Sequence, residues 1–409
     1  MKKNLTNKKG EIIFFLSFVS LLISFFFNED GTGSGAQGDF EVTFGFIFAL
    51  QENLLADPVD WTLVHTPLHF IILSFVARIV DDPYILRMLF CIFSISLPIL
   101  FYLIISLLTE DKTNRTNLLI LSACIFFIPS FRYTSIWAND LITSILFFLF
   151  SIYYFNKWEK NKKEYLDKNL LLQILFLVLA TYTRQYFAVF FIHFLFQYYN
   201  YLPLRNFIKL FLICVLSSIP VFIYTYLFPE LLTGQLITIK AINYFILGNS
   251  SIISLTLYPI ILINLFYKNI SLRKLITPCI LSIIIIFLLQ LNFNPYNWQG
   301  GGINYIISQK LFENNLYFFF SSFFTNLFFI YLFNENKRNT IILLTILFMF
   351  FSMQVYQRYY DPMFFILFFT LIKTDLIKIF FKNINACLLL LFYFFIYYFL
   401  SISDLIYRI

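Results

Sequence analysis

Charged side chains are scarce in this chain of 409 residues: Asp, Glu, Lys and Arg make up 12% of it, whereas 60% of the residues are hydrophobic. An ordinary soluble domain is about one quarter charged and close to half apolar. The apolar residues also stand in long blocks, and blocks of about 18 or more residues with few charges are typical of membrane-spanning helices. The composition therefore excludes a soluble globular protein and predicts an all-α polytopic membrane protein.

Cysteine pairs, internal repeats and low-complexity linkers are also lacking. No CxxC pair occurs, and each of the five cysteines stands alone in an apolar block: Cys91, Cys124, Cys214, Cys279 and Cys387. This spacing excludes a disulfide framework and a cysteine-rich metal site. The segment 11–27 follows a basic N-terminus but has no convincing signal cleavage site, so we expect it to be a retained first helix.

Thirteen apolar blocks are predicted to span the membrane: 11–27, 84–108, 117–131, 139–156, 169–183, 186–200, 207–227, 251–267, 275–293, 315–333, 340–357, 362–372 and 384–401. The block 67–80 is too short for this. At 1.5 Å per residue it reaches roughly 21 Å, whereas the hydrocarbon core is about 30 Å thick.

The distribution of basic residues sets the orientation, because Lys and Arg are enriched in cytoplasmic loops. If 67–80 spanned the membrane, the Lys-rich loop 157–168 would fall outside. If 67–80 instead lies along the outer surface, most of the 29 Lys and Arg residues fall inside. We therefore expect a cytoplasmic N-terminus, an outer C-terminus and a juxtamembrane helix at 67–80. The Lys-rich inner loops are expected to contact anionic lipid and not nucleic acid.

The longest polar stretch is the first outer loop, residues 28–66. Its glycine-rich start is expected to be flexible and to present Asp39 and Glu41, followed by a surface helix over 42–55. His65 closes the loop. Because this loop combines many acids with one of only three histidines before the juxtamembrane helix, it is the predicted place for chemistry.

Arginines form a second group at the outer ends of the predicted spans and on the juxtamembrane helix: Arg87, Arg132, Arg184, Arg358 and Arg78. Arginine is costly at membrane depth unless it faces water, a partner or an anionic ligand, and its planar fork suits phosphate. The alternative is structural, since arginine also anchors helix ends at the headgroups. Arg132 has a second alternative, an ion pair with Asp140.

In this order, the residues resemble those of lipid-linked-sugar glycosyltransferases of the GT-C class, with protein O-mannosyltransferases and lipid A aminoarabinose transferases as the nearest families. The resemblance covers about residues 10–200 and rests on these motifs: Asp39-Phe40-Glu41, His65-Thr66-Pro67-Leu68-His69, Arg87, the segment from Arg132 to Asp140, and Ala180 to Arg184. Phe40 separates the two acids, which are often adjacent in the family. The resemblance implies a GT-C-like catalytic module over 1–227 and a variable transmembrane module over 228–409.

The resemblance implies that a sugar moves from a polyprenyl-phosphate donor to a glycan, lipid or protein acceptor, with inversion, on the outer face of the plasma membrane or on the equivalent luminal face. It assigns the base to Asp39, with Glu41 as its substitute, because a carboxylate must take the proton of the attacking hydroxyl. Arg132 and Asp140 are assigned to the acceptor. The donor phosphate, which needs cationic partners, is assigned to four side chains: Arg87, Arg184, Arg358 and His65. Some relatives use a divalent metal, so a metal cofactor stays open.

Two other functions stay open. One is an O-antigen ligase or polymerase, which also uses prenyl-linked sugars but places its basic loop late in the chain. The other is a non-enzymatic lipid or glycan transporter, a flippase. Transporters tend to carry repeats and midplane charges on broken helices. The acidic first loop and the charges gathered at the outer ends favour the transferase.

Overall fold

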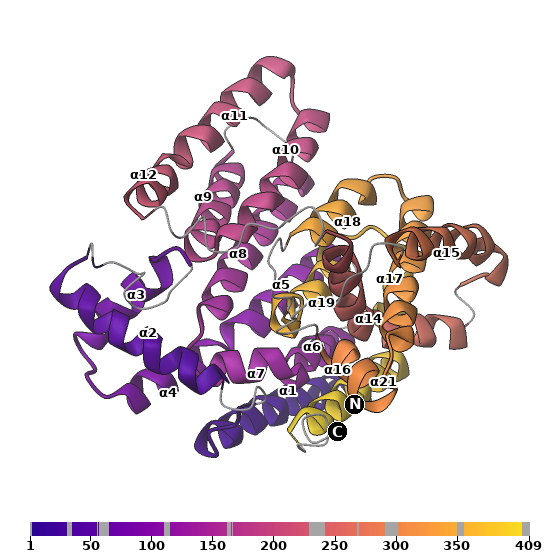
Figure 1. Cartoon of the computed structure of the whole chain (residues 1–409), viewed down its shortest axis with the longest axis horizontal. Coiled ribbons are helices and arrows are strands. Elements are labelled where there is room, and N and C mark those ends of the chain that lie inside the picture. The colour runs from indigo at the N-terminus through magenta and orange to yellow at the C-terminus, as the bar shows by residue number, and fades with distance from the viewer. Residues whose placement is uncertain are drawn as a thin grey trace. The chain divides into compact units, whose positions relative to one another are not determined.

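The computed structural model describes residues 2–30, 35–54, 56, 65–109, 115–161, 165, 167–228, 242–267, 270–290, 302–349 and 356–402. Over these residues the chain forms α-helices and short 3-10 helices and contains no strand (Figure 1). The prediction of an all-α fold is therefore confirmed for the part of the chain that the structure describes.

Within the described ranges, eight helices are long and apolar enough to cross a membrane: Lys8–Phe26, Pro83–Leu108, Asp140–Lys160, Leu204–Tyr224, Ile246–Phe266, Arg273–Gln290, Leu316–Glu335 and Ile384–Ile402. A bent pair, Arg115–Phe127 with Pro129–Ile136, would make a ninth. These nine coincide with nine of the thirteen predicted blocks, which supports a multi-pass membrane protein.

The other four predicted spans are shorter or interrupted helices: α9 (Lys168–Thr183), η4 (Gln185–Val189) followed by α10 (Phe190–Tyr201), α18 (Asn339–Phe348) and α19 (Met363–Thr370). The 16 residues of α9 reach about 24 Å. Part of the block 340–357 lies outside the described residues. Helix length therefore supports eight or nine spans directly. The block 67–80 contains the ten-residue helix α3 (Leu68–Ala77), which is short, as predicted.

The chain divides into two compact units, which we describe separately. The N-terminal unit comprises Phe15–Glu110 and Phe131–Gly234, and the C-terminal unit comprises Met1–Phe14, Asp111–Ser130 and Gln235–Ile409. The helix α1 (Lys2–Phe26) contributes to both, as does α7 (Pro129–Ile136).

The N-terminal unit is centred on α8 (Asp140–Lys160), which packs along α9 and α5. Aromatic side chains pack between α8 and α9; Phe150, for example, lies 4.9 Å from Phe176 between ring centroids. The remaining helices of this unit are α2 (Gly35–Glu52), α3, α4 (Pro83–Phe93), α5 (Ser96–Leu108), α10, α11 (Leu204–Ser217) and α12 (Ile219–Leu227).

The start of α4 shows how local sequence sets a helix boundary. Asp82 is the N-cap, and its Oδ1 accepts hydrogen bonds from the backbone N–H groups of Tyr84, at 2.7 Å, and Ile85, at 3.2 Å. Pro83 stands at the first helical position, where its missing N–H costs nothing. Asp82 and Pro83, which closely follow the block 67–80 in the sequence, therefore begin the next helix.

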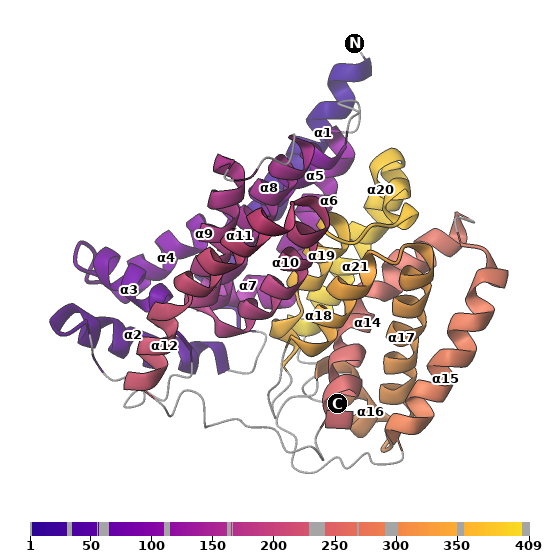
Figure 2. The same ribbon diagram turned by 90° about the horizontal axis from the view of Figure 1, so that it is seen from above.

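The C-terminal unit is built around α14 (Ile242–Phe266), α15 (Ile276–Gln290) and α17 (Leu316–Glu335), which lie side by side in Figures 1 and 2. Small polar residues line the contact of α14 with α17: Thr325 Oγ1 donates to the carbonyl of Ser250 at 2.6 Å. Such side chains let helices approach closely in a membrane. Other elements are α6 (Arg115–Cys124), η3 (Ile125–Phe127), η6 (Leu272–Leu275), α16 (Gly302–Leu311), α18, η7 (Gln357–Tyr359), α19, η8 (Asp375–Ile377), α20 (Lys378–Lys382) and α21 (Ile384–Ile402).

The first turns of α1 pack closely on α6 within this unit. A Cβ atom on Gly10 would lie 3.0 Å from the Cα of Thr116 and 3.1 Å from its carbonyl oxygen, both of which are backbone atoms. One residue on, Glu11 pairs with Arg115 at 2.8 Å. The lack of a side chain at residue 10 therefore sets the distance between the two helices.

Gly10→Ala is expected to lower the thermal unfolding temperature of the detergent-solubilised protein, because α1 and α6 must separate to admit the methyl group. Gly38→Ala is the matched control, since nothing lies within 4 Å of its added Cβ. Replacing glycine by alanine inside a helix otherwise gains up to about 1 kcal/mol. Equal unfolding temperatures for the two variants would contradict the close packing.

Candidate functional site

The predicted site residues fall in both units. Arg358, in η7, belongs to the C-terminal unit. The other seven belong to the N-terminal unit: Asp39, Glu41, His65, Arg87, Arg132, Asp140 and Arg184. Within the N-terminal unit these seven residues form three neighbourhoods: around α2, around the turn between α7 and α8, and beside α3.

Asp39 and Glu41 lie on α2, which begins at Gly35 and not, as predicted, at residue 42. The reason is Phe40, which is buried and packs 6.2 Å from Trp137 between ring centroids. Neighbouring side chains on a helix point about 100° apart, so burying Phe40 leaves both acids exposed on its flanks. Gln37 Nε2 donates to Glu41 Oε1 at 3.1 Å.

Arg87 is 93% buried but has no carboxylate within ion-pair distance among the residues that the structure describes. Its Nε donates to the carbonyl of Ile136 at 3.0 Å and its Nη2 to Asn28 Oδ1 at 3.1 Å. The guanidinium carbon lies 3.5 Å from the centroid of the Trp137 ring, with two further rings nearby, those of Phe25 and Phe40. Aromatic faces attract a cation without neutralising it.

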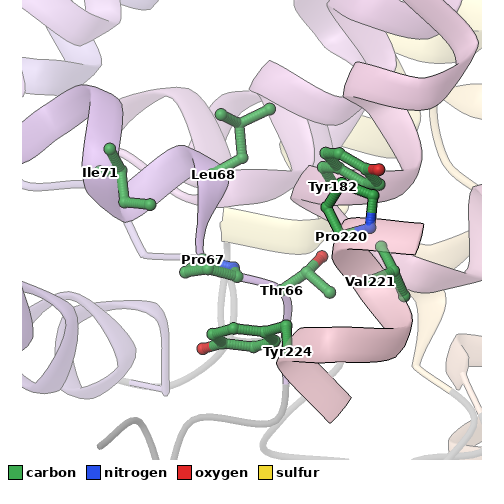
Figure 3. A pocket seen from close by; sticks show the side chains of 8 residues that line it. All are labelled: Thr66, Pro67, Leu68, Ile71, Tyr182, Pro220, Val221 and Tyr224. Carbon is green, nitrogen blue, oxygen red and sulfur yellow. The ribbon is translucent and has the colours of Figure 1, made fainter. Parts of the chain in front are cut away.

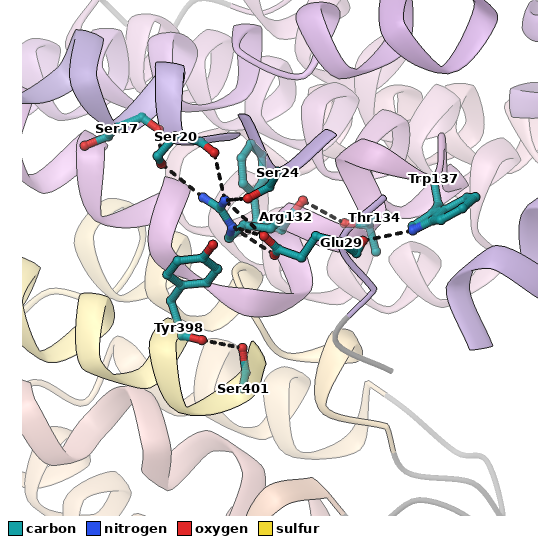
Figure 4. Close-up of polar contacts among 10 residues, drawn as sticks. Ser17, Ser20, Ser24, Glu29, Arg132, Thr134, Trp137, Tyr398 and Ser401 are labelled. Atoms are coloured by element: carbon teal, nitrogen blue, oxygen red, sulfur yellow. Dashed lines mark hydrogen bonds and ion pairs between the residues drawn. The ribbon is translucent and has the colours of Figure 1, made fainter. Parts of the chain in front are cut away.

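Arg132 is held in a different way (Figure 4). It is fully buried, and its Nε donates to Glu29 Oε1 at 3.0 Å. Its Nη2 donates to the carbonyl of Ser20 at 3.0 Å and to the hydroxyl of Ser24. The alternative pairing of Arg132 with Asp140 is therefore wrong, and Arg132 serves as a structural cation that joins α7 to the end of α1. Sequence reasoning missed Glu29, because nothing marks one loop acid as the partner of an arginine 103 residues away.

Asp140 pairs with Arg184 instead. The Nη2 of Arg184 donates to Asp140 Oδ1 at 2.5 Å and to Asn139 Oδ1 at 3.0 Å, and both ionic side chains are buried. Asp140 Oδ2 is also buried and has no hydrogen-bond donor in the described ranges. Because the pair is internally neutral, Arg184 is a weaker candidate than Arg87 for an anionic ligand.

Two histidines lie close enough to Asp140 for electrostatic interaction, His65 and His69. His69 Nε2 lies 3.0 Å from the carbonyl of Ala138, which can only accept, so Nε2 carries the proton and Nδ1 accepts from Thr143 Oγ1 at 2.9 Å. Burial lowers the pKa of His69 to about 4, although the charge of Asp140 opposes this. His69 is therefore neutral at pH 7 and positions the turn before α8. His69 ends the motif that begins at His65, but it was not among the predicted site residues.

The backbone at this site takes an uncommon conformation at two residues. Asn28 has φ of 50° and Ala138 has φ of 46°. Asparagine tolerates this left-handed region, but alanine rarely adopts it. At Ala138 the conformation directs the carbonyl to His69 and begins the turn into α8. Strain of this kind often lies at functional sites, which favours this turn as part of one.

An apolar pocket of about 200 Å³ lies beside α3 (Figure 3). Its lining comes from the start of α3, the end of α9 and α12: Thr66, Pro67, Leu68, Ile71, Tyr182, Pro220, Val221 and Tyr224. Thr66 Oγ1 donates to the carbonyl of Thr181 at 3.1 Å and so ties two of these walls together. In the chain, His65 precedes Thr66 and Arg184 follows Tyr182 by two residues, so two predicted site residues neighbour the pocket lining in sequence.

A metal site in a protein requires several His, Cys, Asp or Glu side chains close together. Nowhere in the part of the chain that the structure describes do three His, Cys, Asp or Glu side chains come together as a metal site requires. We therefore assign no residue to a metal.

Asp140→Asn is expected to destabilise the protein strongly, by about 3–5 kcal/mol, because it leaves the Arg184 guanidinium buried without this carboxylate. Replacing both, with Asp140→Asn and Arg184→Gln, should restore part of the loss. Thermal unfolding measures the effect, and Asp375→Asn is the control because its pair with Lys378 is exposed. An Asp140→Asn variant as stable as the control would contradict the buried pair.

No protein-family model, curated protein or solved structure matches this chain. The resemblance to GT-C enzymes therefore rests on the order of residues in the sequence alone. Function has to be argued from the site, because a fold class by itself does not fix an activity.

Proposed function

We propose that this chain is a membrane glycosyltransferase of the GT-C type, which moves a sugar from a polyprenyl-phosphate donor to an acceptor on the outer side. The observation that carries the proposal is the buried cation of Arg87, which meets no carboxylate in the described residues. It lies 5.6 Å from the ring of Phe40, the residue that separates Asp39 from Glu41 in the sequence. Transfer from a lipid phosphate requires a fixed cation for the phosphate and a carboxylate as base.

The reaction assigns a separate task to each charge. The acceptor hydroxyl oxygen bonds to the anomeric carbon, and its proton passes to Asp39. The bond from that carbon to the phosphate oxygen breaks, and its electron pair leaves with the lipid phosphate. Arg87 stabilises the charge that develops there. Glu41 is the substitute for Asp39, and its Oε1 accepts a hydrogen bond from Gln37 Nε2 at 3.1 Å.

Comparison of the arginines favours Arg87 as the main phosphate ligand. Arg132 is neutralised by Glu29 and Arg184 by Asp140, whereas the Nε and Nη2 of Arg87 donate to neutral oxygens only. Arg184 and His65 then have a supporting role beside the apolar pocket. Asp140 would orient the acceptor through Oδ2, which has no protein donor in the described ranges.

The apolar pocket and the spans supply the lipid side of the proposal. An apolar pocket whose lining is followed or preceded in the chain by Arg184 and His65 suits a ligand that has a prenyl chain and a phosphate. We include in the proposal the full count of thirteen spans, a cytoplasmic N-terminus and a catalytic face on the outer side of the plasma membrane. The distribution of Lys and Arg supports this orientation.

Transfer of radiolabelled sugar from polyprenyl-phosphate donors, measured in membranes with matched expression, tests the base. Asp39→Asn should reduce transfer roughly 10²- to 10⁴-fold, because the amide cannot take the proton. Glu52→Gln, exposed at the end of the same helix, is the control and should leave transfer unchanged. Full activity in Asp39→Asn with loss in Glu41→Gln would move the base to Glu41. Absence of transfer from any donor by the wild type would contradict the proposal and favour a ligase or a transporter.

Arg87→Lys tests the phosphate ligand. Lysine keeps the charge but loses the planar fork that stacks on Trp137, so kcat/KM for the donor should fall about tenfold to a hundredfold. Arg78→Lys, at the exposed end of α3, is the matched control. Equal donor kinetics in the two variants would remove Arg87 from the site.

A further inference from the structure

The C-terminal unit contains a buried carboxyl group that the proposed reaction does not use. Asp361, between η7 and α19, is 98% buried. It contacts Thr256 of α14 and Tyr397 of α21, and both of these residues belong to candidate spans, Ile246–Phe266 and Ile384–Ile402. Ionisable groups enclosed between membrane spans are rare and usually mark a function.

The neighbours of this carboxyl group are neutral. Asp361 Oδ2 accepts from Gln357 Nε2 at 2.8 Å and from the Tyr397 hydroxyl at 3.0 Å, and Oδ1 accepts from Thr256 Oγ1 at 3.3 Å. No cation lies within ion-pair distance of it in the described ranges. An ionised Asp361 would therefore be a buried charge balanced only by dipoles, which is unfavourable.

The surrounding donors decide which ligand could relieve this charge. A metal ion needs oxygen lone pairs, but the Gln357 amide nitrogen has none to offer, and its Oε1 already accepts from the backbone N–H of Ile303 at 3.4 Å. A proton needs no additional space. The hydroxyls of Thr256 and Tyr397 can each accept as well as donate, so either can turn to accept from a protonated carboxyl group.

We propose that Asp361 is a proton-binding site that takes up and releases a proton through the hydroxyls of Thr256 and Tyr397 while the chain stays folded. The proposal goes beyond the transferase reaction and does not depend on it. All three side chains lie in the C-terminal unit, to which sequence analysis assigned no chemistry except at Arg358.

The pKa of the Asp361 carboxyl group lies close to physiological pH. Burial raises the pKa of Asp361 to about 6, and the hydrogen bonds from Gln357, Tyr397 and Thr256 oppose this rise. An unfolded Asp has a pKa of about 3.9, so folding favours the protonated form. The stability from this group is complete below about pH 4, falls as pH rises to about 6, and is constant above that.

Among the described residues, the titratable or charged groups that interact with Asp361 or lie next to it in the chain are of types that do not titrate at this pH. They are two tyrosines of α21 and the residues of its own segment: Tyr393, Tyr397, Arg358, Tyr359 and Tyr360. Tyrosine and arginine side chains ordinarily have pKa values of about 10 and above 12. A titration near pH 6 in this unit is therefore assigned to Asp361.

Infrared spectroscopy of the full chain in lipid nanodiscs tests the proposal directly. The wild type should show the C=O band of a protonated carboxylic acid that fades with a midpoint near pH 6, and Asp361→Asn should lack this component. Asp375→Asn, an exposed carboxylate of the same unit, is the control and should retain it. Thr256→Val and Tyr397→Phe should each raise the midpoint by about one unit, because each removes a donor to the carboxylate.

Three results would overturn the proposal. One is a wild-type carboxylic acid band that does not change across this pH range, and another is a fading band that persists in Asp361→Asn. The third is a midpoint that shifts when sodium is replaced by choline, which would identify a metal-cation site.

If Asp361→Asn fails to fold, the shifts in Thr256→Val and Tyr397→Phe decide the question, and unchanged midpoints in both would contradict the proposal. Sugar transfer is not measured, so this test and that of the transferase fail independently.

Discussion

A charge removed from water must be compensated inside the protein, and this constraint organises the polar interior of the chain. In a medium of low dielectric constant, an uncompensated ion costs several kcal/mol. In the described ranges, five buried ionic side chains, among them Asp140 as the partner of Arg184, meet the constraint in three ways. Arg132 and Arg184 each pair with a carboxylate, Arg87 lies among aromatic rings, and Asp361 is surrounded by neutral donors.

The kind of compensation separates structural charges from functional candidates. A closed ion pair such as Arg132 with Glu29 leaves little attraction for anything else, and it fixes α7 against the end of α1. Compensation by rings or neutral donors leaves the charge available to a ligand of opposite sign. By this criterion, Arg87 is suited to an anion and Asp361 to a proton, and the two belong to different units.

The sequence predicts the positions of the helices better than it predicts which side chains contact each other. Long apolar blocks identify the spans, because their hydrophobicity is a local property. The sequence does not predict that α2 extends back to Gly35. This extension depends on the contact of Phe40 with the ring of Trp137, which lies almost a hundred residues away in the chain. Partner choice among charges fails for the same reason: the sequence suggests Asp140 as the partner of Arg132, whereas the folded chain pairs Arg132 with Glu29. The catalytic assignments stay predictions, and so does the division of the chain at residue 227.

Trp137 contacts both Glu29, the partner of Arg132, and Arg87. It contacts the first through its indole N–H and the second through its ring face. Its indole N–H donates to the carbonyl of Glu29 at 3.0 Å, while its ring face stacks on the Arg87 guanidinium at 3.5 Å. Indole emission responds to nearby charge and polarity. An anion that settles on Arg87 would therefore change the fluorescence of Trp137, which makes this side chain an intrinsic optical reporter of the cation it holds.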